Sequence, residues 1–326
     1  VVDPMPRKKI NRILFHHHSL HQKTRHENET IALDHLDELR DDFALRGRCE
    51  MFRVDLKSMA AAHQLHQGTN LRGHLVWAKM PHFQRLLTIR NVQAPEEDED
   101  ILQFFREHHD PTIYMERHAM RRGEFRKLIS PLVRSGHLVQ DYRGGFKTVE
   151  PITSSDLWEV KRDFLRDLVK DYPVITLKQV ERLAGSPFSA EEISDVMREF
   201  EEDDTLIKGF LVDDMHDVCW GRHDMLENSD VLSKTRDLVI PPSDPLIHYY
   251  GSLLREKFGY GSAYLVFHRE EPVAAFKANT RAGVIQITDF VGDSDLEKEA
   301  LRVMKEFAWE HDMPLKGKLY ERLRSR

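Results

Sequence analysis

The stretch Glu124–Val149, EFRKLISPLVRSGHLVQDYRGGFKTV, decides the fold of this chain. Its first part spaces apolar residues as a helix does and predicts a helix over Glu124–Ser135, with Gly136 where helices commonly end in a left-handed turn. Two short strand-like stretches then flank the residues RGG at 143–145, a combination typical of a β-hairpin. A helix followed directly by such a hairpin is the end of a winged helix-turn-helix module.

Two further helices are expected before this stretch. The apolar pattern predicts one over Ile101–His108 and another over Ile113–Met120, with Pro111 breaking the first. We interpret the residues RRG at 121–123 as the turn that leads into the third helix. Three helices and a two-stranded wing complete the order of a winged helix.

The next segment repeats this order. Helices are predicted over Leu157–Val169 and Thr176–Ala184, and Ser189 with a glutamate three residues later is a capping-box pattern that opens a third. Strand-like residues over Leu206–Val212 and Val218–Arg222 then form a second wing. Two consecutive copies of the same order are typical of tandem modules.

The two ends of the chain are less regular. Near the N-terminus we predict helices over 10–20, 31–45, 55–66 and 81–88, with a strand or hairpin over 71–80. Near the C-terminus we predict an extended entry at 238–245, a helix over 246–258, strands at 263–268, 272–278 and 284–290, and a long amphipathic helix over 295–311.

The fold class that follows is α+β, with tandem winged helix-turn-helix modules before a small antiparallel β-barrel-like domain and its C-terminal helix. We expect an N-terminal winged-helix-like module over 1–93, a basic winged helix over 94–152, an acidic winged helix over 153–228 and the barrel-like domain over 229–326. An acidic linker at 95–100 separates the first two.

Composition excludes several classes of protein. The chain has 326 residues, of which 40% are hydrophobic and 32% charged, as in a folded, well-solvated protein. Its two cysteines, Cys49 and Cys219, lie far apart, so neither a zinc ribbon nor a disulfide scaffold is expected. No apolar run reaches membrane-spanning length, and no phosphate-binding loop or hydrolase motif is present. We therefore expect a cytoplasmic, nucleoid-associated protein without cofactor, metal or membrane.

Positive charge is concentrated on the first winged helix. The formal net charge of the whole chain is -7, yet eight basic residues against three acidic ones give Met115–Lys147 a net +5. Arginine suits recognition of phosphate and guanine, and the start of the third helix and the wing are where such modules contact DNA. The predicted contacts are Arg117, Arg121, Arg122, Arg126, Lys127, Arg143 and Lys147.

The second winged helix has the opposite charge. Between Ser189 and Asp204 there are eight acidic residues and a single basic one, which gives a net -7. Phosphate repulsion would outweigh any base contact made by such a helix. We therefore expect this module to face a protein partner or to serve the structure alone.

Three motifs resemble a known family of winged-helix DNA-binding proteins. They are Leu71–Val76 (LRGHLV), similar to an Arg-Gly-Thr-Leu-His-Leu strand, Pro242–Leu246 (PSDPL), similar to a Ser-Pro-Phe-Asp entry, and Lys277–Gly283, similar to a Lys-Ala-Asp-Arg hairpin. The family includes the bacterial crosslink-repair DNA glycosylases and the C-terminal region of Lhr-type helicases. The resemblance implies a DNA partner and adds Arg72 and Arg281 to the predicted contacts.

The sequence departs from that family at its catalytic motif. The glycosylases carry Gln-apolar-Gln or Gln-apolar-Asp in the first module, whereas no glutamine occurs between Lys23 and His63 here. The nearest similar residues are Gln64 and His66 in Gln-Leu-His. Hydrolysis of an N-glycosidic bond needs a group that steadies the sugar cation and the water. The candidates are Asp37, Gln64 and His66, with the helical carboxylates Asp34 and Asp55 as further options.

Three functions stay open on these grounds. The first is DNA binding in repair or processing without catalysis, and the second is excision of alkylated or crosslinked bases by a DNA glycosylase. The third is a protein-interaction scaffold that uses the acidic module. A pair of histidines four residues apart, His17 and His21, also fits two metal ligands on a helix, although no third ligand is nearby in sequence.

Overall fold

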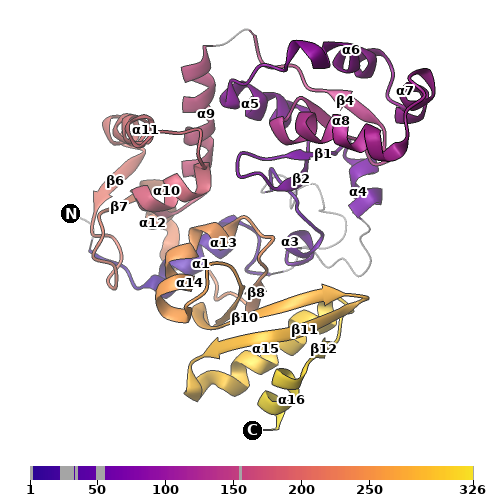
Figure 1. Ribbon diagram of the computed structural model, residues 1–326. Coiled ribbons are helices and arrows are strands. Elements are labelled where there is room, and N and C mark those ends of the chain that lie inside the picture. Colours follow the sequence, from indigo (N-terminus) through magenta and orange to yellow (C-terminus); the bar gives the residue numbers. More distant parts are fainter. Residues whose placement is uncertain (1–2, 23–32, 34–35, 49–55, 154–155, 326) are drawn as a thin grey trace.

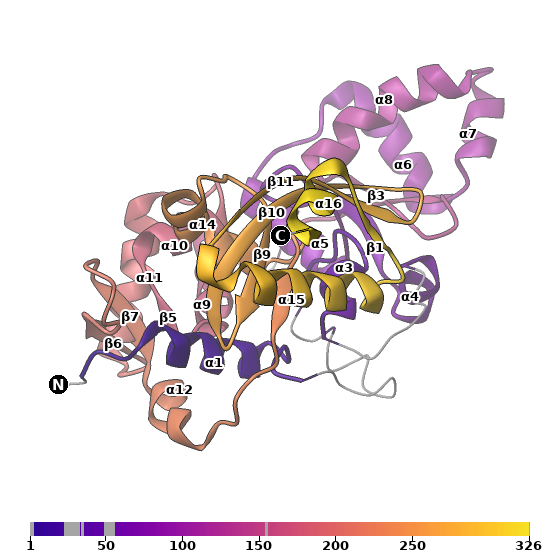
Figure 2. The ribbon, with the colours of Figure 1, turned by 90° about the horizontal axis from the view of Figure 1, so that it is seen from below.

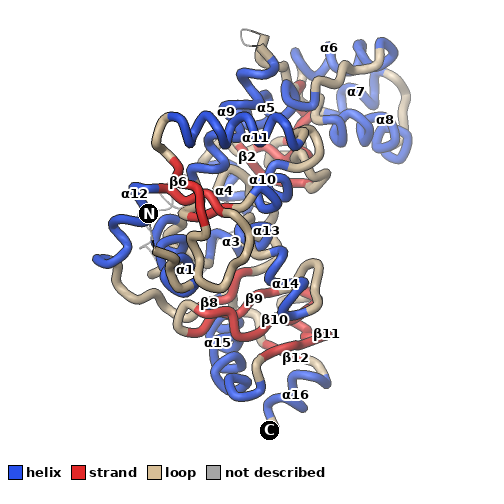
Figure 3. The backbone as a smooth tube through the Cα atoms, turned by 90° about the vertical axis from the view of Figure 1, so that its left-hand side faces the viewer, coloured by secondary structure: helices blue, strands red, loops and turns tan. Residues whose placement is uncertain are grey.

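A computed structural model describes residues 3–22, 33, 36–48, 56–153 and 156–325. Figure 1 shows three groups of elements: the helices around α9 on one side, those around α8 on the other, and a strand-rich part below that contains the C-terminus. The architecture is α+β with several small sheets, which appear as separate red patches in Figure 3. Within the described residues no helix is both long and apolar enough to cross a membrane.

The N-terminal part differs from the prediction at three helices. Its elements are α1 (Arg7–His17), α3 (Phe43–Arg46), α4 (Leu56–Ala62), β1 (His66–Thr69), β2 (Leu75–Ala78) and α5 (Met80–Arg90). The first helix ends at His17, which leaves His21 outside it, and much of the helix expected over 31–45 lies outside the described residues. The helix expected to reach His66 ends at Ala62, because Gln64 adopts a positive φ of 54° and the chain turns into β1.

The basic module has the predicted order of elements. It comprises α6 (Glu99–Glu107), preceded by the 3-10 turn η2 (Glu96–Asp98), then α7 (Pro111–Arg117), α8 (Arg122–Ser135), β3 (Leu138–Gln140) and β4 (Phe146–Thr148). Gly136 caps α8 in the left-handed conformation, as expected. Two details were wrong: Pro111 opens α7, where its missing N–H costs nothing, and Arg122 already lies in α8.

The β3–β4 hairpin of this module extends the sheet of the N-terminal hairpin. Strand β1 pairs with β3 through Gln67 and Gln140, which makes one four-stranded sheet in the order β2-β1-β3-β4. Gly68 permits this pairing, because a Cβ there would lie 2.7 Å from Phe83 and 2.8 Å from Val139. The sheet therefore joins strands from before and after residue 93, where the sequence analysis places a domain boundary. The domain boundaries expected from the sequence stay predictions.

The acidic module also follows the predicted order, with one extra strand. It contains α9 (Leu157–Lys170), β5 (Val174–Ile175), α10 (Leu177–Ala184), α11 (Ala190–Glu202), β6 (Leu206–Gly209) and β7 (Cys219–Arg222), then α12 (His223–Glu227) and η3 (Asn228–Val231). The hydroxyls of Thr176 and Ser189 accept hydrogen bonds from Gln179 and Glu192, so both predicted caps are present. Strand β5, which was not predicted, pairs with β7.

The C-terminal part is a curled, open half-barrel rather than a closed barrel. Its sheet order is β12-β11-β10-β9-β8, from β8 (Leu238–Ile240), β9 (Tyr264–His268), β10 (Glu271–Arg281), β11 (Val284–Gly292) and β12 (Leu315–Lys316). Its helices are α13 (Leu246–Tyr249), α14 (Gly251–Phe258), α15 (Glu297–Glu310, after η4, Ser294–Leu296) and α16 (Lys318–Arg324). The helix expected over 246–258 is thus two helices, and β12, parallel to β11, was not predicted.

Successive side chains of β9 point to opposite faces of this sheet, and each face packs against a different core. Leu265 and Phe267 face a core that includes Phe15 of α1, whereas Val266 faces Phe307 of α15. Figure 2 shows α15 lying across the strands. The first core also takes in residues of α9, α10 and α11, so α1 lies between the acidic module and the half-barrel.

Candidate functional site

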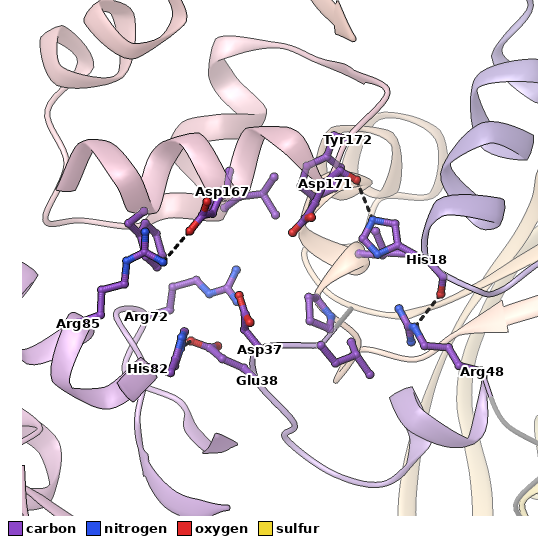
Figure 4. Close-up of a pocket in the computed structure, with 16 residues that line it drawn as sticks. His18, Asp37, Glu38, Arg48, Arg72, His82, Arg85, Asp167, Asp171 and Tyr172 are labelled. Atoms are coloured by element: carbon purple, nitrogen blue, oxygen red, sulfur yellow. Dashed lines mark hydrogen bonds and ion pairs between the residues drawn. The ribbon is translucent and has the colours of Figure 1, made fainter. Parts of the chain in front are cut away.

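A cleft opens between the residues before α3, helix α5 and helix α9 (Figure 4). It consists of an outer part of about 680 Å³ and an adjoining recess of about 120 Å³. We call the two together the central cleft. The residues that line both parts are Leu36, Asp37, His82, Arg85, Asp167 and Asp171.

Glu38 is a fixed, ionised carboxylate in the recess. Asn70 donates a hydrogen bond of 2.6 Å to one of its oxygens, and Nε2 of His82 lies 3.0 Å from the other. Burial by itself would raise the pKa of Glu38, but these hydrogen bonds and the charges of His82 and Arg72 outweigh burial and lower the pKa below its ordinary value. Glu38 therefore keeps its negative charge in the cleft.

The neighbouring Asp37 is in a different environment. Its side chain is exposed to the solvent of the cleft, and Figure 4 shows its carboxylate turned into the space below α9. Enclosure by the cleft walls nevertheless raises the pKa of Asp37 more than the charge of His82 lowers it, and the carboxylates of Asp171 and Glu38 raise it further. Two adjacent carboxyl groups with pKa values shifted in opposite directions are the arrangement that acid-base chemistry requires.

Helix α9 supplies the opposite wall. Asp167 and Asp171 are four residues apart, and so lie on one face of the helix. Arg85 of α5 donates a hydrogen bond of 2.9 Å to Asp167 and stacks its guanidinium 5.4 Å from the ring centre of Phe164. This ion pair links α5 to α9.

A buried ion pair closes the floor of the recess. Arg48, which is 0% exposed, donates a hydrogen bond of 2.6 Å to Asp244 and further hydrogen bonds to the carbonyl groups of Ala44 and His18. Asp244 belongs to the PSDPL motif, so the motif's acid ties the entry of the half-barrel to α1 and α3. Sequence analysis did not predict this pair, because its members are 196 residues apart.

The turn between β1 and β2 carries Arg72 into the cleft. The side-chain oxygen of Asn70 accepts hydrogen bonds from the backbone of Arg72 at 3.1 Å and of His74 at 2.9 Å, and Gly73 turns the chain with a φ of 78°. Figure 4 shows the side chain of Arg72 reaching into the recess. Burial lowers the pKa of Arg72 more than the charge of Glu38 raises it.

The candidate catalytic residues do not come together. Asp37 lines the central cleft, whereas Gln64 is exposed at the bend before β1. His66 is buried on β1, where burial, followed by the positive charge of Lys147, lowers its pKa, and it does not line the cleft. Asp34 and Asp55 lie outside the described residues.

Most of the predicted nucleic-acid contacts lie on the basic module, away from the central cleft. Arg122 and Arg126 are exposed on the first turns of α8, and Arg117 lies 5.4 Å from the ring centre of Phe104. The remaining basic residues on this surface are exposed Arg121, Lys127 and Arg143 and half-buried Lys147. Arg72 is the member of the predicted set that lines the cleft.

Arg281 lies neither on the basic module nor in the central cleft. It ends β10 and is exposed at the β10–β11 turn, where with Arg46 and His311 it lines a shallow hollow of about 340 Å³. The basic module, the central cleft and this turn are therefore three separate groups of predicted residues.

The acids of α11 are partly neutralised within the molecule. Lys161 of α9 lies 2.7 Å from Glu192, Arg166 lies 3.1 Å from Glu199, and Arg198 pairs with Asp195 on the same helix. Several of its acids thus stabilise the packing of α11 on α9. Phe210, beyond the end of β6 in the same module, is 58% exposed.

His17 and His21, whose spacing fits two metal ligands on a helix, do not lie on one helix. His21 lies past the helix and stacks on His16 at 4.0 Å between ring centres, whereas His17 lies 3.7 Å from Asp171. In the part of the chain that the structure describes, no three residues of the types that bind metals come together as a site.

Sequence analysis missed most of the cleft. Glu38, His82, Arg85, Asp167 and Asp171 were not named as candidates. The signals were present: His82 and Arg85 are three apart on α5, and Asp167 and Asp171 are four apart on α9. The sequence does not reveal that these residues of α5 and α9 face each other across the cleft.

The fold and site together define the class of structure: a mixed α+β chain whose small sheets and half-barrel surround a cleft rich in carboxylates. No family model and no curated protein sequence matches the chain. Among solved structures, the Streptomyces sahachiroi DNA glycosylase AlkZ is similar over 97% of this chain and 100% of that chain, with a TM-score of 0.67 and 10% sequence identity. The likeness confirms, at the level of the fold, the resemblance to the crosslink-repair glycosylases.

Proposed function

We propose that this protein binds DNA and removes a modified base by hydrolysing its N-glycosidic bond in the central cleft. One observation carries the proposal: Asp37 and Glu38 stand side by side in a cleft with their pKa values shifted apart, in a chain with the fold of a DNA glycosylase. We also interpret the segments 99–148 and 157–222 as tandem winged helices, of which the basic one approaches DNA.

The chemistry needs two different carboxylates. Water attacks C1′ of the sugar and gives a proton to ionised Asp37, while the C1′–N bond breaks and the base leaves with the bonding electrons. The sugar passes through a cation-like transition state, which the fixed negative charge of Glu38 stabilises. The products are the free base and an abasic sugar.

The charge of the cleft favours a particular class of base. Among the described residues four carboxylates line it, of Asp37, Glu38, Asp167 and Asp171, beside the basic side chains of Lys79, Arg72, Lys170, Arg85 and Arg48, of which the last two pair with Asp167 and Asp244. The carboxylates of Asp37 and Asp171 attract an alkylated purine with a positively charged ring, and the positive charge makes the base a better leaving group. We therefore infer that the substrate is an alkylated purine.

Base release is the direct test of this proposal. Duplex DNA that contains N7-methylguanine is incubated with the protein, and the free base is quantified by chromatography. We expect release by the wild-type chain and a loss of about 10²-fold or more in Asp37→Asn. Asp295→Asn, which removes an exposed carboxylate of η4, is the matched control and should keep full activity. A wild-type chain that releases no base would overturn the proposal.

DNA binding without catalysis is the second candidate. The observation that favours it is the separation of the exposed α8 arginines from the cleft, together with the missing glutamine motif. On this reading Arg122→Ala with Arg126→Ala weakens duplex binding and lowers the slope of log affinity against log salt by about 2. Unchanged binding by this double variant would exclude the proposed surface.

A further inference from the structure

Four basic side chains from three segments interact electrostatically, and one of them, Arg72, lines the recess of the central cleft. Arg40 lies before α3, Arg72 and His74 lie in the turn between β1 and β2, and His248 lies in α13. We call these four residues the arginine–histidine cluster. The positive charges of Arg72, His74 and Arg40 all act on His248, and Arg40 and Arg72 both act on His74.

Arg72 has hydrogen-bonding capacity that the protein leaves unused. Its Nη1 atom is buried and has no hydrogen-bond partner among the described residues, although the guanidinium lines the recess. Its side-chain stem is held at Gly185, where an added Cβ would lie 3.4 Å from Cγ of Arg72. A buried, charged donor without an acceptor is costly, and an anionic oxygen that enters the recess removes the cost.

The acid beside the cluster offsets part of its charge. Glu38 acts on Arg72, His74 and His248, but its two oxygens accept hydrogen bonds from Asn70 and His82, so neither accepts one from Nη1 of Arg72. Burial and then the charges of Arg72, His74 and Arg40 lower the pKa of His248 to about 3. The two guanidinium charges of Arg40 and Arg72, less the negative charge of Glu38, leave one positive charge, which matches one singly charged phosphate.

We propose that the arginine–histidine cluster binds a single phosphodiester group of the DNA backbone, next to the nucleotide whose base enters the central cleft. This deepens, and rests on, the proposed function. A nucleotide rotated out of the duplex brings its flanking phosphates to the mouth of the pocket that holds the base. The planar fork of Arg72 binds such a group through two parallel hydrogen bonds. Recognition of the base edge by Arg72 alone would leave the other three basic residues unexplained.

The test uses the full chain and neutralised phosphates. Duplexes carry one tetrahydrofuran residue as an uncleavable abasic site, and single phosphates around it are replaced in turn by uncharged methylphosphonate. For the wild-type chain we expect one flanking position to weaken binding by about tenfold and more distant positions to have little effect. A flat profile, with equal affinity for every substituted duplex, would overturn the inference.

Variants assign the effect to Arg72. Arg72→Gln should bind the unmodified tetrahydrofuran duplex about tenfold more weakly and lose the dependence on that one phosphate, because the two partners act as a pair. Arg198→Gln, which removes a positive charge on α11, should keep the wild-type profile. If Arg72→Gln keeps the wild-type profile, the inference is wrong. If circular dichroism shows that Arg72→Gln does not fold, Arg72→Lys, which retains the charge, is used in its place.

Base release by the wild-type chain separates this inference from the proposed function. Release of N7-methylguanine together with a flat methylphosphonate profile refutes the phosphate site alone. A chain that neither releases the base nor binds the tetrahydrofuran duplex refutes both.

Discussion

At the scale of single residues, Asp37 and Glu38 show how environment separates two neighbouring carboxyl groups. Glu38 is held by donors on both oxygens, whereas Asp37 faces the cleft with Asp171 near it. The pKa of Glu38 is lowered and that of Asp37 is raised. The different roles proposed for them follow from these contacts, since the two side chains differ by a single methylene group.

The pH dependence of base release follows from the raised pKa of Asp37. Asp37 must be ionised to accept a proton, so kcat/KM should rise with pH through its raised pKa, above the ordinary value of about 4. Asp171→Asn removes a negative neighbour and should shift this acid limb to lower pH. A limb that stays in place in this variant would show that another group controls the rate.

The buried pair of Arg48 and Asp244 gives a prediction about stability. Asp244→Ala removes the carboxylate from a fully buried guanidinium and should lower the free energy of unfolding by about 3–5 kcal/mol. Asp230→Ala, which removes the 84% exposed partner of Lys9, is the matched control and should cost less than about 1 kcal/mol. Urea denaturation followed by circular dichroism measures both, and equal losses would contradict the assigned role.

At the scale of elements, a half-buried ion pair adds to the apolar contacts that attach helix α1 to the half-barrel. Arg12 of α1 donates two hydrogen bonds of 2.7 Å to Glu270, in the turn before β10, whose side chain is 4% exposed. Burial would raise the pKa of Glu270, but the hydrogen bond from Arg12, that from the Thr235 backbone and the charge of Arg12 outweigh it and lower the pKa. The pair therefore stabilises the folded chain only while Glu270 is ionised.

Acid should weaken this attachment. Because the pKa of Glu270 is lower in the folded chain, the stability it contributes is present above the unfolded value of about 4.3 and is lost as pH falls through the folded value. Glu270→Gln should cost about 1–3 kcal/mol at pH 7, and its difference from the wild type should shrink as pH falls to 3. Urea denaturation at both pH values measures this, and a difference that grows in acid would refute it.

At the scale of the whole molecule, α1 joins parts that lie far apart in sequence. Phe15 is 0% exposed and meets Phe267 of β9 edge to face at 5.0 Å, in a core shared with α9, α10 and α11. Strand β1 makes a second such link when it pairs with β3. The modules expected from the sequence are thus packed together through the N-terminal segment.

Loss of Phe15 should therefore destabilise the elements that pack on both sides of α1. Phe15→Ala should lower the free energy of unfolding by about 3–5 kcal/mol, because it leaves a cavity in the shared core. Hydrogen exchange should accelerate in both α9 and β9, whereas α8 should keep its protection. Faster exchange confined to α1 would contradict a shared core.

Most helices and strands of the basic and acidic modules were predictable, because their signals are local. The capping residues Thr176 and Ser189 and the αL residue Gly136 act within a few residues of their position. The errors occurred where local signals mislead: His66 continues a helical pattern, but the positive φ of Gln64 turns it into a strand. Strands β5 and β12 were missed because each has two residues and needs a distant partner.

The sequence by itself determined most of the helices and hairpin strands of the basic and acidic modules and the separation of charge between α8 and α11, because periodicity, capping and net charge are properties of neighbouring residues. Only the tertiary structure decided the central cleft. Asp37, Arg72 and Asp171 come from three distant segments, and their meeting depends on how helices and strands pack. Of the candidate catalytic residues that the structure describes, Asp37 lines the cleft whereas Gln64 and His66 do not, because packing rather than local pattern decides which side chains face a common space.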